Sequence, residues 1–118
     1  MDKAFKYDVI VCTFNGASFI SSQLESILSQ AILPQKIIVS DDGSCDETIF
    51  IVRNTFANAN FTAYNIVQGP RKGGIANFLF ALKYSEADFT FLADQDDIWH
   101  FDKVEKMVEC MENNPKIE

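Results

Sequence analysis

Apolar runs of strand length alternate along the chain with stretches whose apolar residues recur at helical spacing. Two of the runs, 7–12 and 36–40, have interiors that are almost wholly apolar and rich in β-branched residues. Such a run is typical of a strand that is buried on both faces, as strands of a parallel sheet are. The alternation therefore predicts an α/β fold: a parallel sheet covered by helices on both faces, with right-handed crossovers.

The expected order of elements is β-α-β-α-β-α-β-α. The predicted strands are 7–12, 36–40, 61–67 and 89–93, and the predicted helices are 18–30, 44–57, 75–84 and 101–114. The third strand has the weakest pattern, which favours a place near a sheet edge. The fourth strand is rich in aromatic residues and is expected to be buried.

Polar residues at the helix starts indicate where each helix begins. Ser18 is the expected N-cap of the first helix, and Ser44 with Glu47 has the spacing of a capping box for the second. In the later helices the apolar residues expected to face inward are Phe78, Leu79, Leu82, Val104, Met107, Val108 and Met111.

The bulk properties exclude several classes of protein. The 118 residues suit one domain, and 47% of them are hydrophobic, which is enough for a core. The formal net charge of −7 argues against a nucleic-acid partner, because duplex binding relies on basic surface. No apolar run reaches the length of a transmembrane span. The three widely spaced cysteines are typical of reduced cytosolic thiols and not of a disulfide framework or a zinc site.

Polar clusters follow all four predicted strands: residues 13–16, 41–44, 71–74 and 94–97. In an open parallel sheet, ligands bind at the carboxyl ends of the strands, near the point where the strand order reverses. The three carboxylates within 94–97 would repel one another unless a cation lies among them. Hard oxygen ligands suit Mg²⁺ or Mn²⁺, and Mg²⁺ is often shared with substrate phosphates. The set predicts a site for a metal and a phosphate.

Each cluster also has a simpler explanation. The acids of 94–97 could form a solvated loop that caps the next helix, and Asp41 and Asp42 could be a turn with a helix cap. Thr13 and Asn15 could be turn residues only. Arg71 could be one of an exposed pair of basic residues, or it could approach a phosphate with help from the glycine-rich loop.

Four segments together resemble the family-two glycosyltransferases of the GT-A fold. They are Val9-Ile10-Val11-Cys12-Thr13-Phe14-Asn15-Gly16, Ile37-Ile38-Val39-Ser40-Asp41-Asp42-Gly43-Ser44, Gly73-Gly74-Ile75-Ala76-Asn77-Phe78 and Leu92-Ala93-Asp94-Gln95-Asp96-Asp97-Ile98-Trp99. The last segment looks most like the bacterial rhamnosyltransferase branch. The resemblance extends from about Tyr7 to the end of the chain.

The resemblance implies roles for individual residues. Thr13 and Phe14 would line the pocket for the base and ribose of a nucleotide, with Asn15 beside them. Asp42 matches the acid that accepts a hydrogen bond from the ring N–H of uracil or thymine, and Asp41 would support its loop.

At the other end of the nucleotide, the resemblance implies a metal site. Asp94 and Asp96 stand at the D-x-D positions. Asp96 would bind the Mn²⁺ or Mg²⁺ that bridges the pyrophosphate, while Asp94 would lie near the metal and the ribose or donor sugar. Arg71 would lie on the phosphate side.

The chain also departs from the family pattern. Cys12 replaces the usual proline of the first motif, and Ala76 replaces the arginine often found in the third. Family catalytic domains are longer, and their later half carries the acceptor site and a carboxylate general base, which we expect beyond Glu118. Residues 1–118 are therefore expected to be the nucleotide-sugar-binding N-terminal part of an inverting transferase, inactive when isolated.

The parent enzyme is expected to act in cell-surface polysaccharide synthesis in the cytoplasm, including the inner face of the membrane. Its donor would be linked to UDP or dTDP, and its acceptor would be a saccharide or lipid-linked. Two alternatives remain: a non-catalytic interaction module that keeps this half-fold, and a signalling receiver domain. A receiver domain has its acidic pair after the first strand, whereas the acidic pairs of this chain follow the predicted second and fourth strands.

Overall fold

The computed structural model describes residues 5–94 and 97–113, which form four strands and four helices in strict alternation. The elements are β1 (Tyr7–Thr13), α1 (Ile20–Leu28), β2 (Lys36–Asp41), α2 (Thr48–Asn58), β3 (Tyr64–Gln68), α3 (Gly74–Leu82), β4 (Phe89–Ala93) and α4 (Lys103–Asn113). This order confirms the α/β prediction.

The strands form one sheet in the order β3-β2-β1-β4, and every neighbouring pair is parallel. The central strands, β1 and β2, are the two runs whose interiors are almost wholly apolar, and β1 is buried along its whole length. The edge position predicted for the third strand is confirmed. The prediction that the fourth strand is buried is wrong: within the described residues β4 pairs only with β1, and Leu92 is 37% exposed. Apolar composition alone does not specify how many neighbours a strand has.

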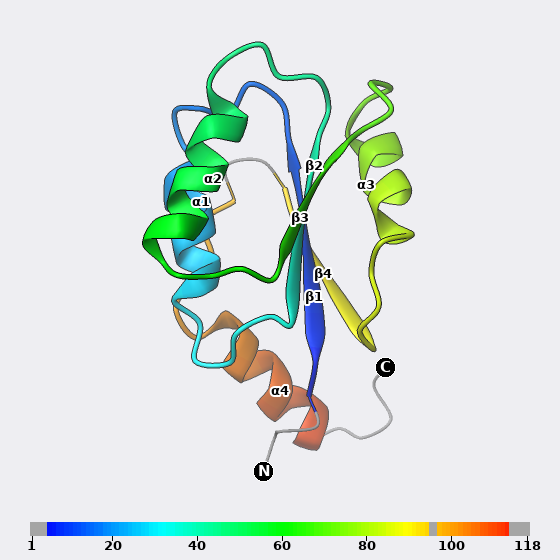
Figure 1. The fold of residues 1–118 in the computed structure, drawn as a ribbon. Helices are drawn as coiled ribbons and strands as arrows, with labels where there is room; N and C mark the ends of the chain where they lie inside the picture. Colours follow the sequence, from blue (N-terminus) through cyan, green and yellow to red (C-terminus); the bar gives the residue numbers. More distant parts are fainter. Residues whose placement is uncertain (1–4, 95–96, 114–118) are drawn as a thin grey trace.

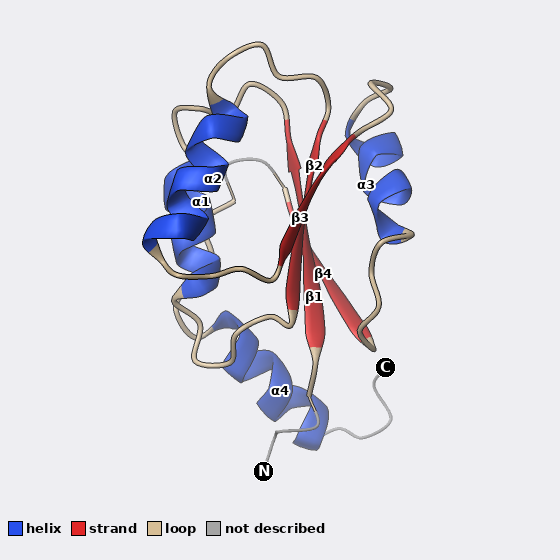
Figure 2. Ribbon diagram, viewed as in Figure 1, coloured by secondary structure: helices blue, strands red, loops and turns tan. Residues whose placement is uncertain are grey.

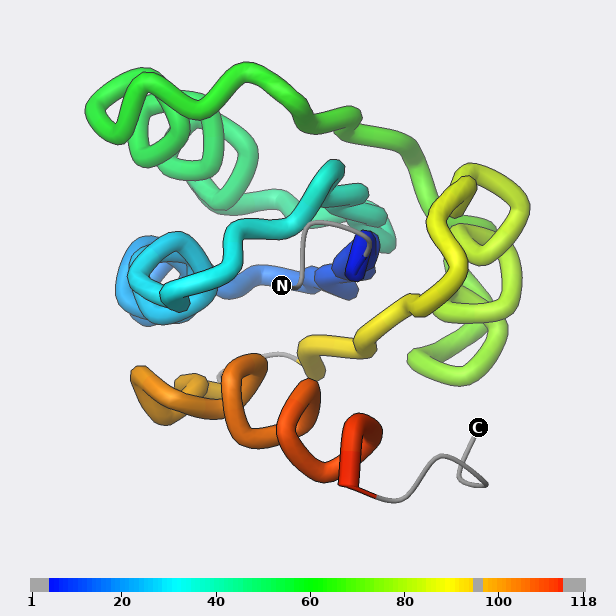
Figure 3. Tube along the Cα trace, turned by 90° about the horizontal axis from the view of Figure 1, so that it is seen from below, coloured from blue at the N-terminus to red at the C-terminus, as the bar shows by residue number. Residues whose placement is uncertain are grey.

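Helices cover both faces of the sheet, as Figures 1 and 2 show. In the view from below, α1 lies between α2 and α4 on one face, and α3 lies on the other (Figure 3). The larger core fills the three-helix face and includes Phe56 of α2 and Val104 and Val108 of α4. Trp99 belongs to this core together with these residues of the last helix, and its ring centroid lies 5.6 Å from that of Phe91.

Both predicted helix caps are wrong. The first helix begins at Ile20 and the second at Thr48, and neither has a side-chain hydrogen bond from its N-cap residue. The Ser44 hydroxyl instead accepts the Asn15 N–H at 2.8 Å and donates to Asp41 Oδ1 at 2.6 Å, so it joins two loops and does not cap the helix. At the start of the second helix, the Asp46 carboxylate accepts a hydrogen bond from the Thr48 N–H at 3.0 Å.

The inward face predicted for the third helix is only partly confirmed. Asn77 and Ala81 are the buried residues of α3, and Phe78 packs against the smaller core. Leu79 is 59% and Leu82 is 37% exposed. Helical periodicity does not show how much of a helix the sheet covers. Among the described elements, α3 is the one helix on its face of the sheet, so its flanks have no neighbouring helix to pack against. In α4, Met107 is also exposed, whereas Val104 and Val108 are buried as predicted.

The carboxyl ends of the strands meet at one edge of the sheet. Thr13 is paired with Asp41, and Asp41 with Gln68, while Ala93, which precedes Asp94, is paired with Val11. The chain leaves β1 toward β2 and returns to the other side of β1 to form β4, so the strand order reverses between β1 and β4. No helix among the described residues is both long and apolar enough to cross a bilayer.

Candidate functional site

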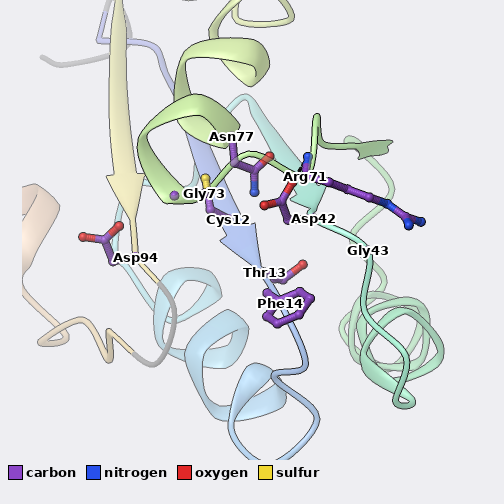
Figure 4. A pocket seen from close by; sticks show the side chains of 10 residues that line it. Cys12, Thr13, Phe14, Asp42, Gly43, Arg71, Gly73, Asn77 and Asp94 are labelled. Carbon is purple, nitrogen blue, oxygen red and sulfur yellow. Dashed lines mark hydrogen bonds between the residues drawn. The ribbon is translucent and has the colours of Figure 1, made fainter.

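A cavity of about 570 Å³ lies where the strand order reverses, a size typical of small-molecule sites. Its lining comes from all four strand-to-helix connections and consists of Cys12, Thr13, Phe14, Asp42, Gly43, Arg71, Gly73, Gly74, Asn77 and Asp94. Figure 4 shows Asp94 on one side of the cavity and Asp42 on the other, with Cys12 between them. Five of the predicted site residues therefore line one cavity: Thr13, Phe14, Asp42, Arg71 and Asp94.

Asp41 lies behind the cavity and holds two of its loops together. Its Oδ1 accepts hydrogen bonds from the hydroxyls of Thr13 (2.7 Å) and Ser44 (2.6 Å). Its Oδ2 accepts from the N–H groups of Ser44 (2.9 Å) and Gly43 (3.3 Å). With its carboxylate engaged in this way and 8% exposed, Asp41 has the supporting position that the sequence predicted.

Asp42 is half-buried and faces the cavity. Its N–H donates to the Thr13 carbonyl at 2.9 Å, and its Oδ1 accepts a hydrogen bond from the Arg71 N–H. Arg71 has a positive φ of 61°, and its side chain extends over Gly43, past the mouth of the cavity (Figure 4). The loops after β2 and β3 are thus joined through the main chain of Arg71, with its guanidinium at the rim.

Asn15 does not line the cavity. Its N–H donates to Ser44 Oγ at 2.8 Å, and its Oδ1 accepts from the Cys45 N–H at 2.7 Å. It also has a positive φ of 49°, which asparagine tolerates better than most residues. Its contacts are those of the turn residue that the sequence left as an alternative. Phe14, its neighbour, is 52% exposed at the mouth of the cavity.

Asn77 and Gly69 belong to the site and were not among the predicted site residues. Asn77 is 2% exposed; its Nδ2 donates to the Ser40 carbonyl (2.9 Å) and its Oδ1 accepts from the Ser40 hydroxyl (2.5 Å). A Cβ on Gly69 would lie 2.3 Å from Asn77 Oδ1 and 2.7 Å from Asp42 Oδ1. Gly69 therefore allows β3 to reach the cavity beside these side chains. Both residues occur in or next to the glycine-rich loop, whose sequence was a signal for them.

The acidic side of the cavity is described only in part. Asp94 is exposed and is one of the residues that line the cavity. Asp96, the residue expected to bind the metal, lies outside the described residues. Among the described residues no group of three or more acidic, cysteine or histidine side chains could hold a metal ion. Asp94 is thus one oxygen ligand beside a cavity that could hold a nucleotide. Such a residue suits Mg²⁺, which takes one or two carboxylates and completes its coordination shell with substrate phosphates and water.

Cys12 lies on the cavity floor between the two acidic sides. Burial, followed by the charges of Asp94 and Asp42, raises the pKa of its thiol to about 11. The thiol is therefore protonated at neutral pH. Because folding favours the protonated form, this group stabilises the fold below its ordinary pKa of 9.0, and the contribution is lost as the pH rises toward about 11.

This environment predicts a difference in reactivity among the three cysteines. Cys45 and Cys110 are exposed, whereas Cys12 is buried and weakly ionised. We expect iodoacetamide at pH 8 to alkylate Cys12 at least about tenfold more slowly than the other two, since the thiolate is the nucleophile. Peptide mass spectrometry over time measures the three rates. The difference should vanish in denaturant; equal rates in the native chain would contradict it.

Comparison with known proteins agrees with this geometry. Residues 8–117 match the family described as glycosyl transferase family 2. The chain is 34% identical to the dTDP-rhamnosyl transferase RfbG of Shigella flexneri over 106 residues, which is 86% of this chain and 36% of that protein. It is 30% identical over 106 residues to an Escherichia coli protein, the UDP-Glc:alpha-D-GlcNAc-diphosphoundecaprenol beta-1,3-glucosyltransferase WfgD, covering 90% of this chain and 41% of WfgD.

A solved structure gives the same result for the fold. The mannosyltransferase PcManGT of Pyrobaculum calidifontis, in complex with GDP-Man and Mn²⁺, superposes with a TM-score of 0.80 at 26% identity, covering 90% of this chain and 32% of that one. The chain thus spans about a third to two-fifths of the length of the proteins it matches. The fold, the family match over nearly all residues and the similarity to a rhamnosyl transferase agree, and the chain belongs to glycosyl transferase family 2.

Proposed function

We propose that residues 1–118 form the donor-binding part of an inverting, metal-dependent glycosyltransferase that uses a nucleoside diphosphate sugar. The observation that carries the proposal is the cavity at the switch point, which has a carboxylate acceptor, Asp42, on one side and a second carboxylate, Asp94, on the other. A nucleotide needs an acceptor for the N–H of its base at one end and a means of neutralising its phosphates at the other. A carboxylate at each end of the same cavity, one to accept from the base and one to hold a cation, supports this proposal.

At the base end, Asp42 would accept a hydrogen bond from the ring N–H of uracil or thymine. Its Oδ1 already accepts the Arg71 N–H, which fixes the carboxylate in place before a ligand arrives. Phe14 offers an exposed aromatic ring at the mouth of the cavity, where a base or ribose could pack against it. Thr13 would shape the pocket through its backbone and methyl group, because its hydroxyl is bonded to Asp41.

At the phosphate end, Asp94 and Asp96 would hold Mn²⁺ or Mg²⁺. The guanidinium of Arg71 extends over Gly43 on the Asp42 side of the cavity, so the phosphate-side role expected for it is not assigned to this end. When bound, the metal would offset the negative charge that develops on the departing nucleoside diphosphate. The PcManGT complex with GDP-Man and Mn²⁺ supports a nucleotide sugar and a divalent ion at such a site.

For the whole protein we propose sugar transfer to an acceptor hydroxyl in cell-surface polysaccharide synthesis. The names of the relatives support this, since RfbG is a dTDP-rhamnosyl transferase and WfgD acts on a diphosphoundecaprenol-linked sugar. A saccharide or lipid-linked acceptor of this kind would place the enzyme in the cytoplasm at the inner face of the membrane. The acceptor site and the general base would belong to the part of such enzymes that this chain does not cover.

A thermal-shift experiment tests the donor site. We expect UDP or dTDP at millimolar concentration with Mn²⁺ to raise the melting temperature of the chain, because a ligand that binds only the folded state stabilises it. Asp42→Ala should weaken nucleotide binding by about 10-fold or more, the effect of removing a hydrogen bond to a charged group. Asp96→Ala should abolish the contribution of Mn²⁺.

Asp88→Ala is the matched control, because Asp88 is an exposed carboxylate just before β4, at the opposite edge of the sheet. This variant should respond to the ligands as the unaltered chain does. If neither nucleotide shifts the melting temperature, the chain is a non-catalytic interaction module and the proposed function is wrong.

A further inference from the structure

The face of α1 that meets the loop between β4 and α4 carries a row of polar side chains. Gln23 and Ser26 are spaced to lie on one side of the helix, and Gln30 follows two residues after its last residue, Leu28. Gln23 is fully buried and Gln30 is 4% exposed, although both have carboxamides. Buried amides need hydrogen-bond partners, and in this row the partners are main-chain groups of the loop.

Ser26 and Gln30 hold the later part of the loop. Ser26 Oγ accepts a hydrogen bond from the Trp99 N–H at 2.9 Å. Gln30 Nε2 donates to the His100 carbonyl at 2.7 Å, and its Oε1 accepts from the Val104 N–H at 3.0 Å. These contacts fix the loop where it enters α4, on the side away from the cavity lining.

Gln23 holds the start of the loop. Its Nε2 donates to the main-chain carbonyl of Asp94, the residue that follows β4 and lines the cavity. Within the part of the chain that the structure describes, its Oε1 has no partner, and the same is true of Trp99 Nε1 in the same interface. A leucine or methionine would fill the same space without a buried unpaired oxygen, so packing alone does not account for the carboxamide.

We propose that Gln23 is a positioning residue for the metal-binding end of the donor site. Its hydrogen bond fixes the main chain at Asp94, the residue that lines this side of the cavity, and so sets the point from which the Asp94 side chain extends. The inference rests on the proposed function, because it assigns to Gln23 a role toward the ion that Asp94 would help to hold. Groups that orient metal ligands commonly contribute 10- to 100-fold to metal affinity.

The chain provides a probe and a matched control. Trp99 is the single tryptophan of the sequence and lies in the loop that α1 holds, so its fluorescence reports on Mn²⁺ binding there. Gln23→Met removes the carboxamide and keeps the volume. Gln30→Met makes the same chemical change seven residues later in the chain, just past the end of α1, where the partners are His100 and Val104.

The experiment titrates Mn²⁺ into each variant at saturating UDP and, separately, UDP without metal. We expect Gln23→Met to raise the Kd for Mn²⁺ by about 10-fold or more, with the metal-free Kd for UDP changed less than about twofold. Gln30→Met should lower the melting temperature and leave the Mn²⁺ affinity unchanged. Gln23→Asn, whose amide is one methylene too short to reach Asp94, should weaken Mn²⁺ binding as well and serves if the methionine variant does not fold.

The outcomes separate the two proposals. If the unaltered chain binds UDP and Mn²⁺ and Gln23→Met binds Mn²⁺ equally well, the role of Gln23 is wrong while the donor site stands. The role is also wrong if Gln30→Met weakens Mn²⁺ binding as much as Gln23→Met, since the effect would then be general loosening of the loop. If the unaltered chain binds neither ligand, the proposed function fails, and the inference fails with it.

Discussion

Gly69→Ala is expected to lower the free energy of unfolding by about 3 kcal/mol, which is at the upper end of the range for overpacking a core. It is also expected to abolish nucleotide binding. The added Cβ would lie 2.3 Å from Asn77 Oδ1 and 2.7 Å from Asp42 Oδ1. Neither oxygen can retreat easily, because Asn77 is bonded to both the hydroxyl and the carbonyl of Ser40 and Asp42 accepts the Arg71 N–H. Urea unfolding gives the change in free energy, and UDP titration gives the change in affinity.

Gly74→Ala is the control for this prediction. Gly74 begins α3, and no atom beyond its neighbours in the chain lies within 4 Å of where its Cβ would be. Here alanine should leave the free energy of unfolding unchanged or raise it by less than about 1 kcal/mol, because it restricts the unfolded chain. If Gly69→Ala is as stable as Gly74→Ala, the close approach of β3 to the cavity is not as described.

Asp41→Ala is expected to lower the free energy of unfolding by about 3 kcal/mol and to weaken UDP binding strongly. The carboxylate accepts four hydrogen bonds, two from hydroxyls and two from N–H groups, and it is nearly buried. Its loss would leave the Thr13 and Ser44 hydroxyls without their acceptor and release the turn that holds Asp42. The measurements are urea unfolding and UDP titration.

Thr13→Val tests the contribution of one hydrogen-bond donor to the Asp41 carboxylate. Valine has the shape of threonine and removes only the 2.7 Å hydrogen bond to Asp41 Oδ1, so the expected loss is about 1 kcal/mol. Since Asp41 keeps its bonds to Ser44 and Gly43, the turn should persist and UDP affinity should fall far less than in Asp41→Ala. Equal effects of the two substitutions would show that Asp41 does not organise the loops.

The fold and the position of the site could be predicted because both follow from local pattern and chain order. Apolar runs define β1 and β2, helical periodicity defines the helices, and parallel strands bring the polar segments after them to one edge of the sheet. Five of the predicted residues line the cavity for this reason. Asn15 and Asp41 are the exceptions among the described residues, since a residue in the right loop can face either the cavity or a neighbouring loop.

The details that could not be predicted depend on partners that are distant in the sequence. Ser44 has the spacing of a helix cap, but its hydroxyl is bonded to Asp41 and accepts the Asn15 N–H. Gln23 interrupts the apolar face of α1 and gives no local signal, because its partner is the main chain of Asp94, 71 residues later. The exposure of Leu92 likewise follows from the neighbours of β4 and not from its composition.

The strand order has a consequence for synthesis on the ribosome. β1, β2 and β3 are consecutive in the chain and adjacent in the sheet, so they can pair in turn as they emerge. β4 must instead dock against β1, with Asp8 and Thr90 brought side by side, and this pairing has a large sequence separation. Contacts of that kind form late because the intervening chain must first be ordered. A nascent chain would therefore acquire the Asp42 side of the cavity first and the Asp94 side only when its last strand docks.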